Sequence, residues 1–268
     1  DRCELVTRAV DEAVGTGTLI GVPNDGIHKT TFPDSALAHK LLDGLTGIEL
    51  GASSHNSLHI AGSLNVAPNE QVEFYRKSQT DTNGKYVEID IYDDGETLST
   101  FNDSSQGFLA NQHVFEHLCN PIKALQTWHR VVWNGGYIFM TLPQRDVHPS
   151  DKGRELTTWS EWCEAYSKGY TPESMPVERT AAAGGHRGHY WVYSAATLKQ
   201  LIALTGLSWV LVAEEDPDQK VGNGFTLVYQ VVKAENHFCV FKTRGCKLIF
   251  GISSPVMLTE LSLTYTSS

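Results

Sequence analysis

The sequence lacks the cysteine pairs, basic runs and long apolar segments that mark several classes of protein. Its five cysteines, spread from Cys3 to Cys246, form no C-x-x-C pair, so their spacing indicates neither a zinc site nor a redox motif. No apolar run approaches the roughly 18 residues that cross a bilayer, and the amino terminus lacks the basic-then-apolar order of a signal peptide. A formal net charge of −10, without basic runs, argues against nucleic-acid or anionic-membrane partners. We therefore expect a cytoplasmic protein with reduced thiols and neither kind of partner.

What remains is a composition suited to a large folded domain. The chain has 268 residues, of which 41% are hydrophobic and 19% charged, which is enough to bury a substantial core. We predict a domain over residues 34–232, preceded by a lead segment at 1–33. A carboxyl-terminal segment at 233–268 has no clear hydrophobic period and is predicted to be a peripheral extension; the alternative is a lid or a dimer element.

Apolar periodicity predicts strands that alternate with helices, which is typical of a parallel sheet. Pro33 precedes a helical pattern at 36–45 for which Asp34 or Ser35 can serve as the N-cap. Further helices are predicted at 121–132 and around 198–205, and strands at 47–50, 63–68, 86–90, 108–111, 137–142, 207–213 and 225–232. Residues 144–193 interrupt this alternation with prolines, glycines and aromatic residues, and are predicted to be an insertion over the active-site edge.

The most informative single stretch is 47–56, in which a short buried strand is followed by small and hydrogen-bonding residues. It would bring Glu49 and Gly51 to the carboxyl edge of a sheet, where open α/β proteins place their ligands. The third glycine of a G-x-G-x-x-G fingerprint is missing, and Ser53 and Ser54 stand in that region instead. Spacing alone therefore leaves open whether this stretch forms a nucleotide-binding site.

A second block, at 108–143, contains a strand, a Glu-His turn, a helix, a Gly-Gly turn and another strand. Together the two blocks resemble the class I S-adenosylmethionine-dependent methyltransferases, in particular the type 11-like small-molecule group. The resemblance implies an α/β fold: a Rossmann-like, seven-stranded, mostly parallel sheet flanked by helices, with the last strand antiparallel and the insertion at 144–193 as a substrate cap. It also implies S-adenosylmethionine as the cofactor.

The resemblance implies a set of cofactor-binding residues along the sheet edge. Asp90 occupies the position that hydrogen-bonds the adenine amino group, with apolar contacts beside it. The full set is Glu49, Gly51, Ala52, Ser53, Asn65, Asp90, Ile91, Tyr92 and Gln112. Two departures are evident, because Ala67 stands where the family has a ribose-binding acid, and Gln106-Gly107 replaces an aspartate that opens the fourth strand.

Two histidines that follow the fourth strand are the catalytic candidates. His113 can act as a base near neutral pH because imidazole titrates close to pH 6.5. His117 is the second candidate, although Glu116 and His117 can equally be structural residues of the turn.

The substrate candidates lie in the insertion and are Arg145, His148, His186 and His189. Arg145 is suited to a carboxylate or phosphate, and the alternative is a solvated loop. His186 and His189 have the spacing of metal ligands, but the sequence places no third ligand, so we predict no metal site.

These observations lead to one functional hypothesis and one alternative. The first is methyl transfer from S-adenosylmethionine to a small-molecule acceptor by direct displacement. The alternative is a methyltransferase-fold protein with lost or repurposed activity that binds a ligand or partner, or promotes another reaction in its pocket; Ala67 and Gln106-Gly107 favour it.

Overall fold

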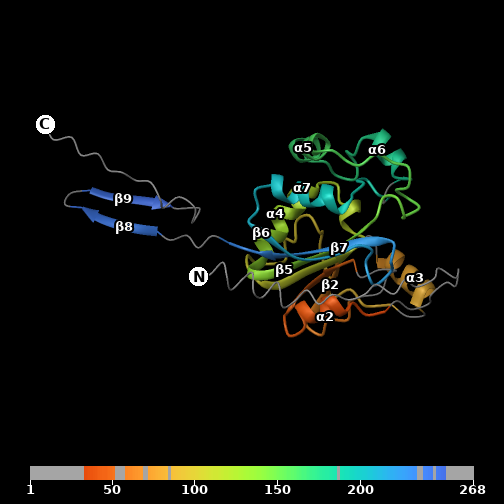
Figure 1. The fold of residues 1–268 in the computed structure, drawn as a ribbon, viewed down its shortest axis with the longest axis horizontal. Helices are drawn as coiled ribbons and strands as arrows, with labels where there is room; N and C mark the ends of the chain where they lie inside the picture. Colours follow the sequence, from red (N-terminus) through yellow and green to blue (C-terminus); the bar gives the residue numbers. More distant parts are fainter. Residues whose placement is uncertain are drawn as a thin grey trace.

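The computed structural model describes residues 33–51, 58–68, 72–83, 86–185, 188–233, 238–243 and 246–251. Three of the predicted site residues, Ala52, Ser53 and His186, lie outside the described residues, as does most of the lead segment. The body of the described chain is a seven-stranded sheet with helices on both faces (Figure 1).

The sheet has the strand order β3-β2-β1-β4-β5-β7-β6. Its strands are β1 (Gly47–Leu50), β2 (Ser63–Ala67), β3 (Ile91–Tyr92), β4 (Gln106–Gln112), β5 (Val132–Pro143), β6 (Trp209–Glu215) and β7 (Gly224–Val231). β1 to β5 pair in parallel, whereas β7 is antiparallel to both β5 and β6. The predicted Rossmann-like sheet with an antiparallel last strand is confirmed.

The helices are α2 (Ala36–Leu42), α3 (Val72–Asn83), α4 (Pro121–Val131), α5 (Trp159–Lys168), α6 (Val177–Ala182) and α7 (Ala195–Leu204), with a short 3₁₀ helix η2 (Phe115–His117). α2 begins where predicted, and the hydroxyl of Ser35 rather than Asp34 caps it by accepting a hydrogen bond from Ala38 N at 3.1 Å. Asn120 caps α4, which opens on Pro121. None of the described helices is long and apolar enough to cross a membrane.

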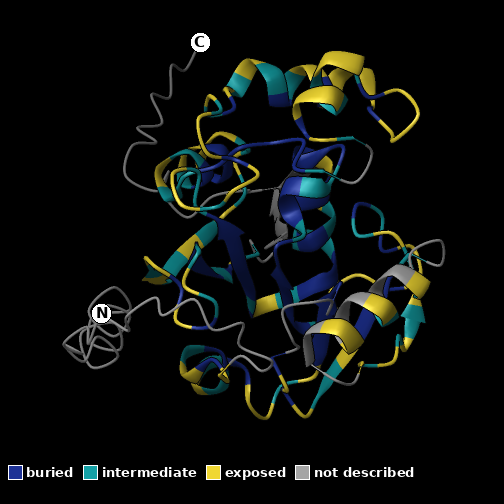
Figure 2. Cartoon of the chain, turned by 90° about the vertical axis from the view of Figure 1, so that its right-hand side faces the viewer, coloured by how far each residue is buried: buried dark blue, intermediate teal, exposed yellow. Residues whose placement is uncertain are grey.

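Side chains alternate across the sheet and build one core on each face. Phe108 and Ala110 of β4 pack with Ala38 and Leu42 of α2 on one face. On the other face, a larger cluster that includes Leu109 of β4 packs against α4, α5 and α7. Figure 2 shows this buried interior between the helical layers. The parallel strands thereby hold their carboxyl ends along one edge of the sheet.

The prediction of a third strand at 86–90 is wrong. Residues 86–89 have no regular secondary structure, and the strand is the shorter β3 that follows them. The reason is a local pairing of another kind: Asp90 N donates to Asn65 O at 2.9 Å, while Asn65 N donates to the Asp90 carboxylate at 2.7 Å. The Asp90 carboxylate thus takes the place of the backbone carbonyl that would accept this hydrogen bond in a β-ladder.

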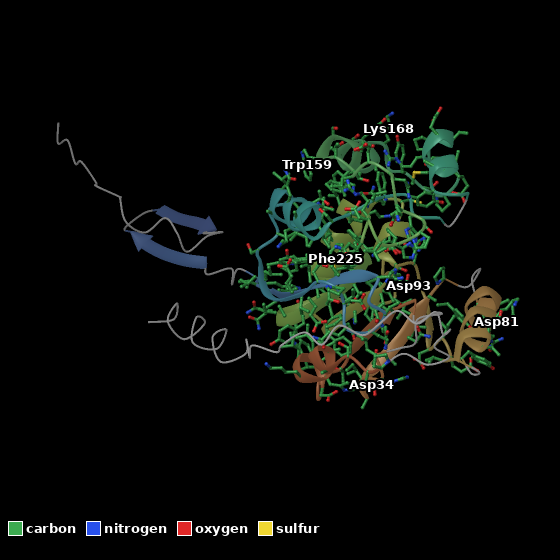
Figure 3. The ribbon with its side chains drawn as sticks, turned by 45° about the vertical axis from the view of Figure 1, so that its right-hand side comes forward. Asp34, Asp81, Asp93, Trp159, Lys168 and Phe225 are labelled. Carbon is green, nitrogen blue, oxygen red and sulfur yellow. The ribbon has the colours of Figure 1, made fainter. Side chains whose placement is uncertain are left out.

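The insertion at 144–193 contains α5 and α6 and lies on the α4 face of the sheet. Figure 3 shows α5, marked at its two ends by Trp159 and Lys168, on one side of the sheet that carries Phe225. Its anchor is apolar, since the ring of Tyr193 lies against that of Phe115 in η2, with centroids 5.4 Å apart. In the carboxyl-terminal segment, β8 (Phe238–Thr243) and β9 (Cys246–Gly251) form a separate antiparallel pair.

Cys119 is expected to resist alkylation in the folded protein. Its side chain is only 4% exposed, and burial raises the pKa of its thiol to about 12. At pH 8 only about one thiol in ten thousand is then ionised, against roughly a quarter for a free cysteine. Peptide mass spectrometry after iodoacetamide treatment should find Cys119 unmodified in native protein and modified in guanidinium, with the partly exposed Cys163 as internal control. Equal modification of the two cysteines in the native state would contradict this arrangement.

Candidate active site

A buried carboxylate joins β1 to β4 at the carboxyl edge of the sheet. Glu49 is 3% exposed, and its oxygens accept hydrogen bonds from Gln112 Nε2 at 3.1 Å and from Leu58 N at 3.1 Å. Burial raises the pKa of Glu49, while these hydrogen bonds and the charge of Lys220 oppose that effect. Two of the predicted cofactor residues, Glu49 and Gln112, are therefore neighbours.

Gly51 follows β1 directly and turns the chain away from the edge. Its φ of 58° lies in the left-handed region that glycine adopts without strain, and its N–H donates to Val66 O at 2.8 Å. A side chain at this position would strain the turn and stand at the strand end. Glycine is therefore the residue type that this turn at the strand end accommodates.

Lys220 is a member of this site that the sequence analysis missed. It is 5% exposed, and burial lowers the pKa of its ammonium group while the carboxylates of Glu49 and Asp34 oppose that shift. It reaches the site from the loop between β6 and β7, far from β1 in sequence. The only signal for Lys220 in the sequence was a lysine in a segment without a periodic hydrophobic pattern.

The predicted residues at the edge formed by β2 and β3 contact one another. Asn65 and Asp90 are joined by the two hydrogen bonds described above, so Asp90 precedes β3 rather than ending it. Ile91 is partly buried on β3, whereas Tyr92 is 51% exposed. Ala67 ends β2 at 2% exposure.

The acids that follow β3 are Asp93 and Asp94, which the sequence analysis did not select. Both oxygens of Asp93 are used within its loop, since Thr100 and Ser99 donate to them. Asp94 is exposed, and its Oδ1 accepts from Glu96 N at 2.8 Å. The adjacent pair of aspartates was the signal in the sequence for acids at this strand end. It was not recognised because the strand was predicted at 86–90, before its actual position.

The end of β4 is strained at a catalytic candidate. His113 has a φ of 52°, a left-handed value that is uncommon for a residue other than glycine, and its N–H donates to Thr141 O at 2.8 Å. Such strain persists where the surrounding structure enforces it and is frequent at functional sites. Asn111, two residues before His113, is fully buried, and neither polar atom of its side-chain amide has a hydrogen-bond partner among the described residues.

Three predicted site histidines lie around one carboxylate, and a fourth lies beside one of them. Glu116 in η2 is 0% exposed, and its Oε1 lies 3.7 Å from His113 Nδ1, 3.7 Å from His117 Nε2 and 3.9 Å from His189 Nε2. The His148 ring centroid lies 4.8 Å from that of His189. Residues assigned separately to catalysis and to substrate binding thus form one cluster, with Glu116 at its centre.

Burial and charge act against each other in this cluster. Burial raises the pKa of Glu116 to about 7, although the charge of His189 opposes it. Burial alone would lower the pKa of His189, but its hydrogen bond to Asp151 and the carboxylate of Glu116 outweigh burial and raise it. Burial lowers the pKa of His148. The cluster therefore combines a desolvated carboxyl group with imidazoles of unequal basicity.

Arg145 lies apart from these residues. Its guanidinium donates to its neighbour Asp146 at 2.8 and 2.9 Å on the surface, so one acidic partner already occupies it. The predicted substrate role of Arg145 stays a prediction, while His148 and His189 are in place beside Glu116.

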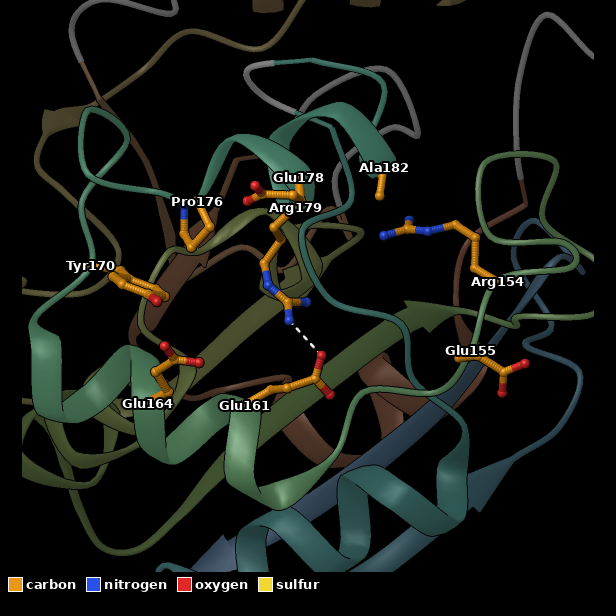
Figure 4. Close-up of a pocket in the computed structure, with 9 residues that line it drawn as sticks. All are labelled: Arg154, Glu155, Glu161, Glu164, Tyr170, Pro176, Glu178, Arg179 and Ala182. Carbon is orange, nitrogen blue, oxygen red and sulfur yellow. Dashed lines mark hydrogen bonds and ion pairs between the residues drawn. The ribbon is translucent and has the colours of Figure 1, made fainter.

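The insertion also carries a surface pocket of about 490 Å³ between α5 and α6 (Figure 4). Its walls hold several acidic residues together with Arg179 and Arg154, and Arg179 is ion-paired to Glu161. Arg154 also binds Asp151 at 2.9 Å, so it connects the pocket wall to the histidine cluster. The pocket lies in the cap and not at the strand ends, and we place the chemistry at the strand ends.

Part of the chain that forms this edge matches the sequence model of a known protein family. Residues 60–140 match the family model described as a methyltransferase domain. Similar solved structures include a SAM-dependent methyltransferase from Aquifex aeolicus (14% identity, 84% of this chain and 98% of that chain, TM-score 0.46). Another is a SAM-dependent methyltransferase, possible histamine N-methyltransferase, from Thermotoga maritima (16%, 73% and 86%, TM-score 0.44). No curated protein matches the chain. The family match runs from the residues before β2 into β5.

Proposed function

We propose that the protein transfers a methyl group from S-adenosylmethionine to a small-molecule acceptor, because residues 60–140 match the model of a methyltransferase domain. The observation that carries the proposal is the Glu49–Gln112 hydrogen bond at 3.1 Å, which joins the ends of β1 and β4 next to the glycine turn at Gly51. It places polar groups and a glycine turn at the edge where open α/β sheets bind ligands.

The residues at this edge fit such a cofactor. Asn111 offers a buried amide whose two polar atoms have no partner among the described residues, and a bound polar ligand would satisfy it. Gly51 contributes no side chain at the strand end, and Ala67 contributes a small one. The small residues and the hydrogen-bonding capacity at the ends of β1, β2 and β4 support a ligand that has an amino-acid part and a nucleoside part.

We assign roles to this chain's residues as follows. Glu49 and Gln112 hold each other and so orient the edge of β1 and β4 toward the cofactor. Asp94 takes the adenine role that the resemblance gave to Asp90, because Asp94 follows β3 and is exposed, whereas the Asp90 carboxylate accepts from Asn65 N. A carboxylate with a free oxygen can accept the hydrogen bond of an amino group.

On the acceptor side, direct displacement requires alignment more than activation. A bound cofactor would supply a methyl group on a positively charged sulfur. His113 at the end of β4 is the base that takes the acceptor's proton. The cap brings His148 and His189 to the same side, where they confine the acceptor and raise its effective concentration.

Calorimetric titration of the purified protein with S-adenosylmethionine and S-adenosylhomocysteine tests the proposal. We expect binding in the wild type and at least about tenfold weaker binding for Glu49→Ala and Asp94→Ala, a loss of about 1.4 kcal/mol or more. Glu214→Ala, an exposed acid on β6 paired with Lys199, is the matched control and should bind as the wild type does. A folded wild type that binds neither ligand would overturn the proposal and leave a repurposed fold.

A further inference from the structure

Three side chains present their ligand atoms to a common point behind the end of β4. The Oε1 atom of Glu116 lies 3.7 Å from His117 Nε2 and 3.9 Å from His189 Nε2. All three ligand atoms lie within 4.8 Å of one another. Two of the residues come from η2, and His189 comes from a segment of the cap without regular secondary structure.

The hydrogen-bond partner of Nδ1 in each histidine determines which ring nitrogen carries the proton. His117 Nδ1 lies 2.9 Å from Gly188 O, and His189 Nδ1 lies 2.8 Å from Asp151 Oδ2. A carbonyl and a carboxylate only accept hydrogen bonds, so both Nδ1 atoms carry the proton. In the neutral imidazoles the lone pair is therefore on Nε2, and both Nε2 atoms face Glu116. Partners of this kind on the distal nitrogen are characteristic of metal-binding histidines.

Glu116 supplies an independent observation. Its side chain is fully buried, and neither carboxylate oxygen has a hydrogen-bond partner among the described residues. The distances to the two imidazoles exceed those of hydrogen bonds. A buried carboxylate without hydrogen bonds is costly, and a cation held between it and the two histidines would remove that cost.

We propose that Glu116, His117 and His189 bind a divalent transition-metal ion such as Zn²⁺ or Fe²⁺. Two imidazoles and one carboxylate, with positions left open, are a donor set that these ions take, whereas Mg²⁺ and Ca²⁺ prefer oxygen ligands. The sequence analysis predicted no metal because His186 and His189 lacked a third ligand. The structure gives His189 different companions, 72 and 73 residues away in sequence, and thereby completes a ligand set.

The two separations from Glu116 Oε1 need little adjustment. Two ligands that are each about 2.1 Å from zinc lie about 3.4 Å apart in a tetrahedral site. The observed separations of 3.7 and 3.9 Å from Glu116 Oε1 would close by a few tenths of an ångström when an ion binds. The outer partner Asp151 is itself held by Arg154 at 2.9 Å, so the His189 ring is oriented before binding.

A second grouping in the same region is a poorer ligand set. His148, Asp151 and His189 also lie close together. However, His148 Nδ1 accepts from Ser150 N at 3.3 Å, and Asp151 is already shared by His189 and Arg154. We therefore assign Asp151 to the outer shell, and His148 borders the open side of the ion.

The metal site shares His189 with the proposed acceptor pocket but none of the residues assigned to the cofactor, and its test uses neither S-adenosylmethionine nor an acceptor. The purified full-length chain is stripped with a chelator and titrated with Co²⁺, with Zn²⁺ and Fe²⁺ in parallel. We expect about one ion per chain by mass spectrometry of the metal, visible d–d bands for the Co²⁺ form, and a higher melting temperature on loading. A failure of cofactor binding would leave these readouts unchanged, so the two proposals are tested separately.

Variants identify the ligands. Glu116→Gln, of equal volume, and His117→Ala or His189→Ala should each weaken Co²⁺ binding at least about 100-fold and change the d–d bands, while Asp151→Asn should weaken it about 10- to 100-fold. His39→Ala, which removes an exposed histidine on α2, should bind as the wild type does. Circular dichroism verifies folding of each variant. A wild type that binds none of the three ions, or a folded Glu116→Gln that binds like the wild type, overturns the proposal.

Discussion

Replacement of Asp218 by alanine is expected to lower the free energy of unfolding by about 3 kcal/mol. This carboxylate is 3% exposed and accepts four backbone hydrogen bonds in the loop between β6 and β7. Oδ1 accepts from the N–H groups of Lys220 at 3.1 Å and Val221 at 2.7 Å, and Oδ2 accepts from Gly222 at 3.0 Å and Gly224 at 2.9 Å. Alanine would leave these donors, two of them buried, without their acceptor.

Urea denaturation followed by circular dichroism measures this loss. Gln219→Ala alters an exposed side chain in the same loop and should change stability by less than about 0.5 kcal/mol. Asp218→Asn keeps one acceptor oxygen and should fall between the two. Because this loop carries Lys220 to Glu49, Asp218→Ala should also weaken cofactor binding. A loss of stability below about 1 kcal/mol would show that the carboxylate does not organise the loop.

Replacement of Trp191 by alanine is expected to cost about 4 kcal/mol, because truncation of a buried tryptophan leaves a large cavity. Its side chain is 0% exposed, and its indole N–H donates to Leu118 O. Its backbone N–H donates to Glu116 O at 3.3 Å, and the Arg179 guanidinium lies 4.4 Å above the ring. Trp191 therefore fastens the cap to the segment that carries Glu116.

The matched control is Trp159→Ala, which removes a partly exposed tryptophan from the same insertion and should cost about 2 kcal/mol or less. Thermal and urea unfolding of the two variants measure the difference. Trp191→Ala should in addition weaken metal binding, because it loosens the anchor next to His189. Equal losses in the two variants would show that the cap is not anchored through Trp191.

Short-range patterns determined most of the sheet. Gly47–Leu50 was predicted with its observed bounds, because a run of residues buried on both faces followed by Gly51 is a local signal. α2 and α4 were predicted because their apolar spacing and capping residues lie within a few positions of one another. The departure is β3, where the alternation at 86–90 indicated a strand but Asp90 instead turned its carboxylate to the backbone of Asn65. That competitor lies 25 residues away and leaves no mark in the local pattern.

The sequence by itself determined the parallel sheet, the match of residues 60–140 to a methyltransferase-domain model and the types of side chain that gather at the strand ends. It identified His113, His117, His148 and His189 as functional candidates, but assigned them to two separate roles. Only the tertiary structure decided that His113, His117 and His189 surround Glu116, that Lys220 lies beside Glu49, and that Asp94 follows β3. The physical reason is that periodicity and capping depend on neighbours in sequence, whereas burial and charge pairing depend on contacts such as Trp191 with Leu118, which join segments 73 residues apart.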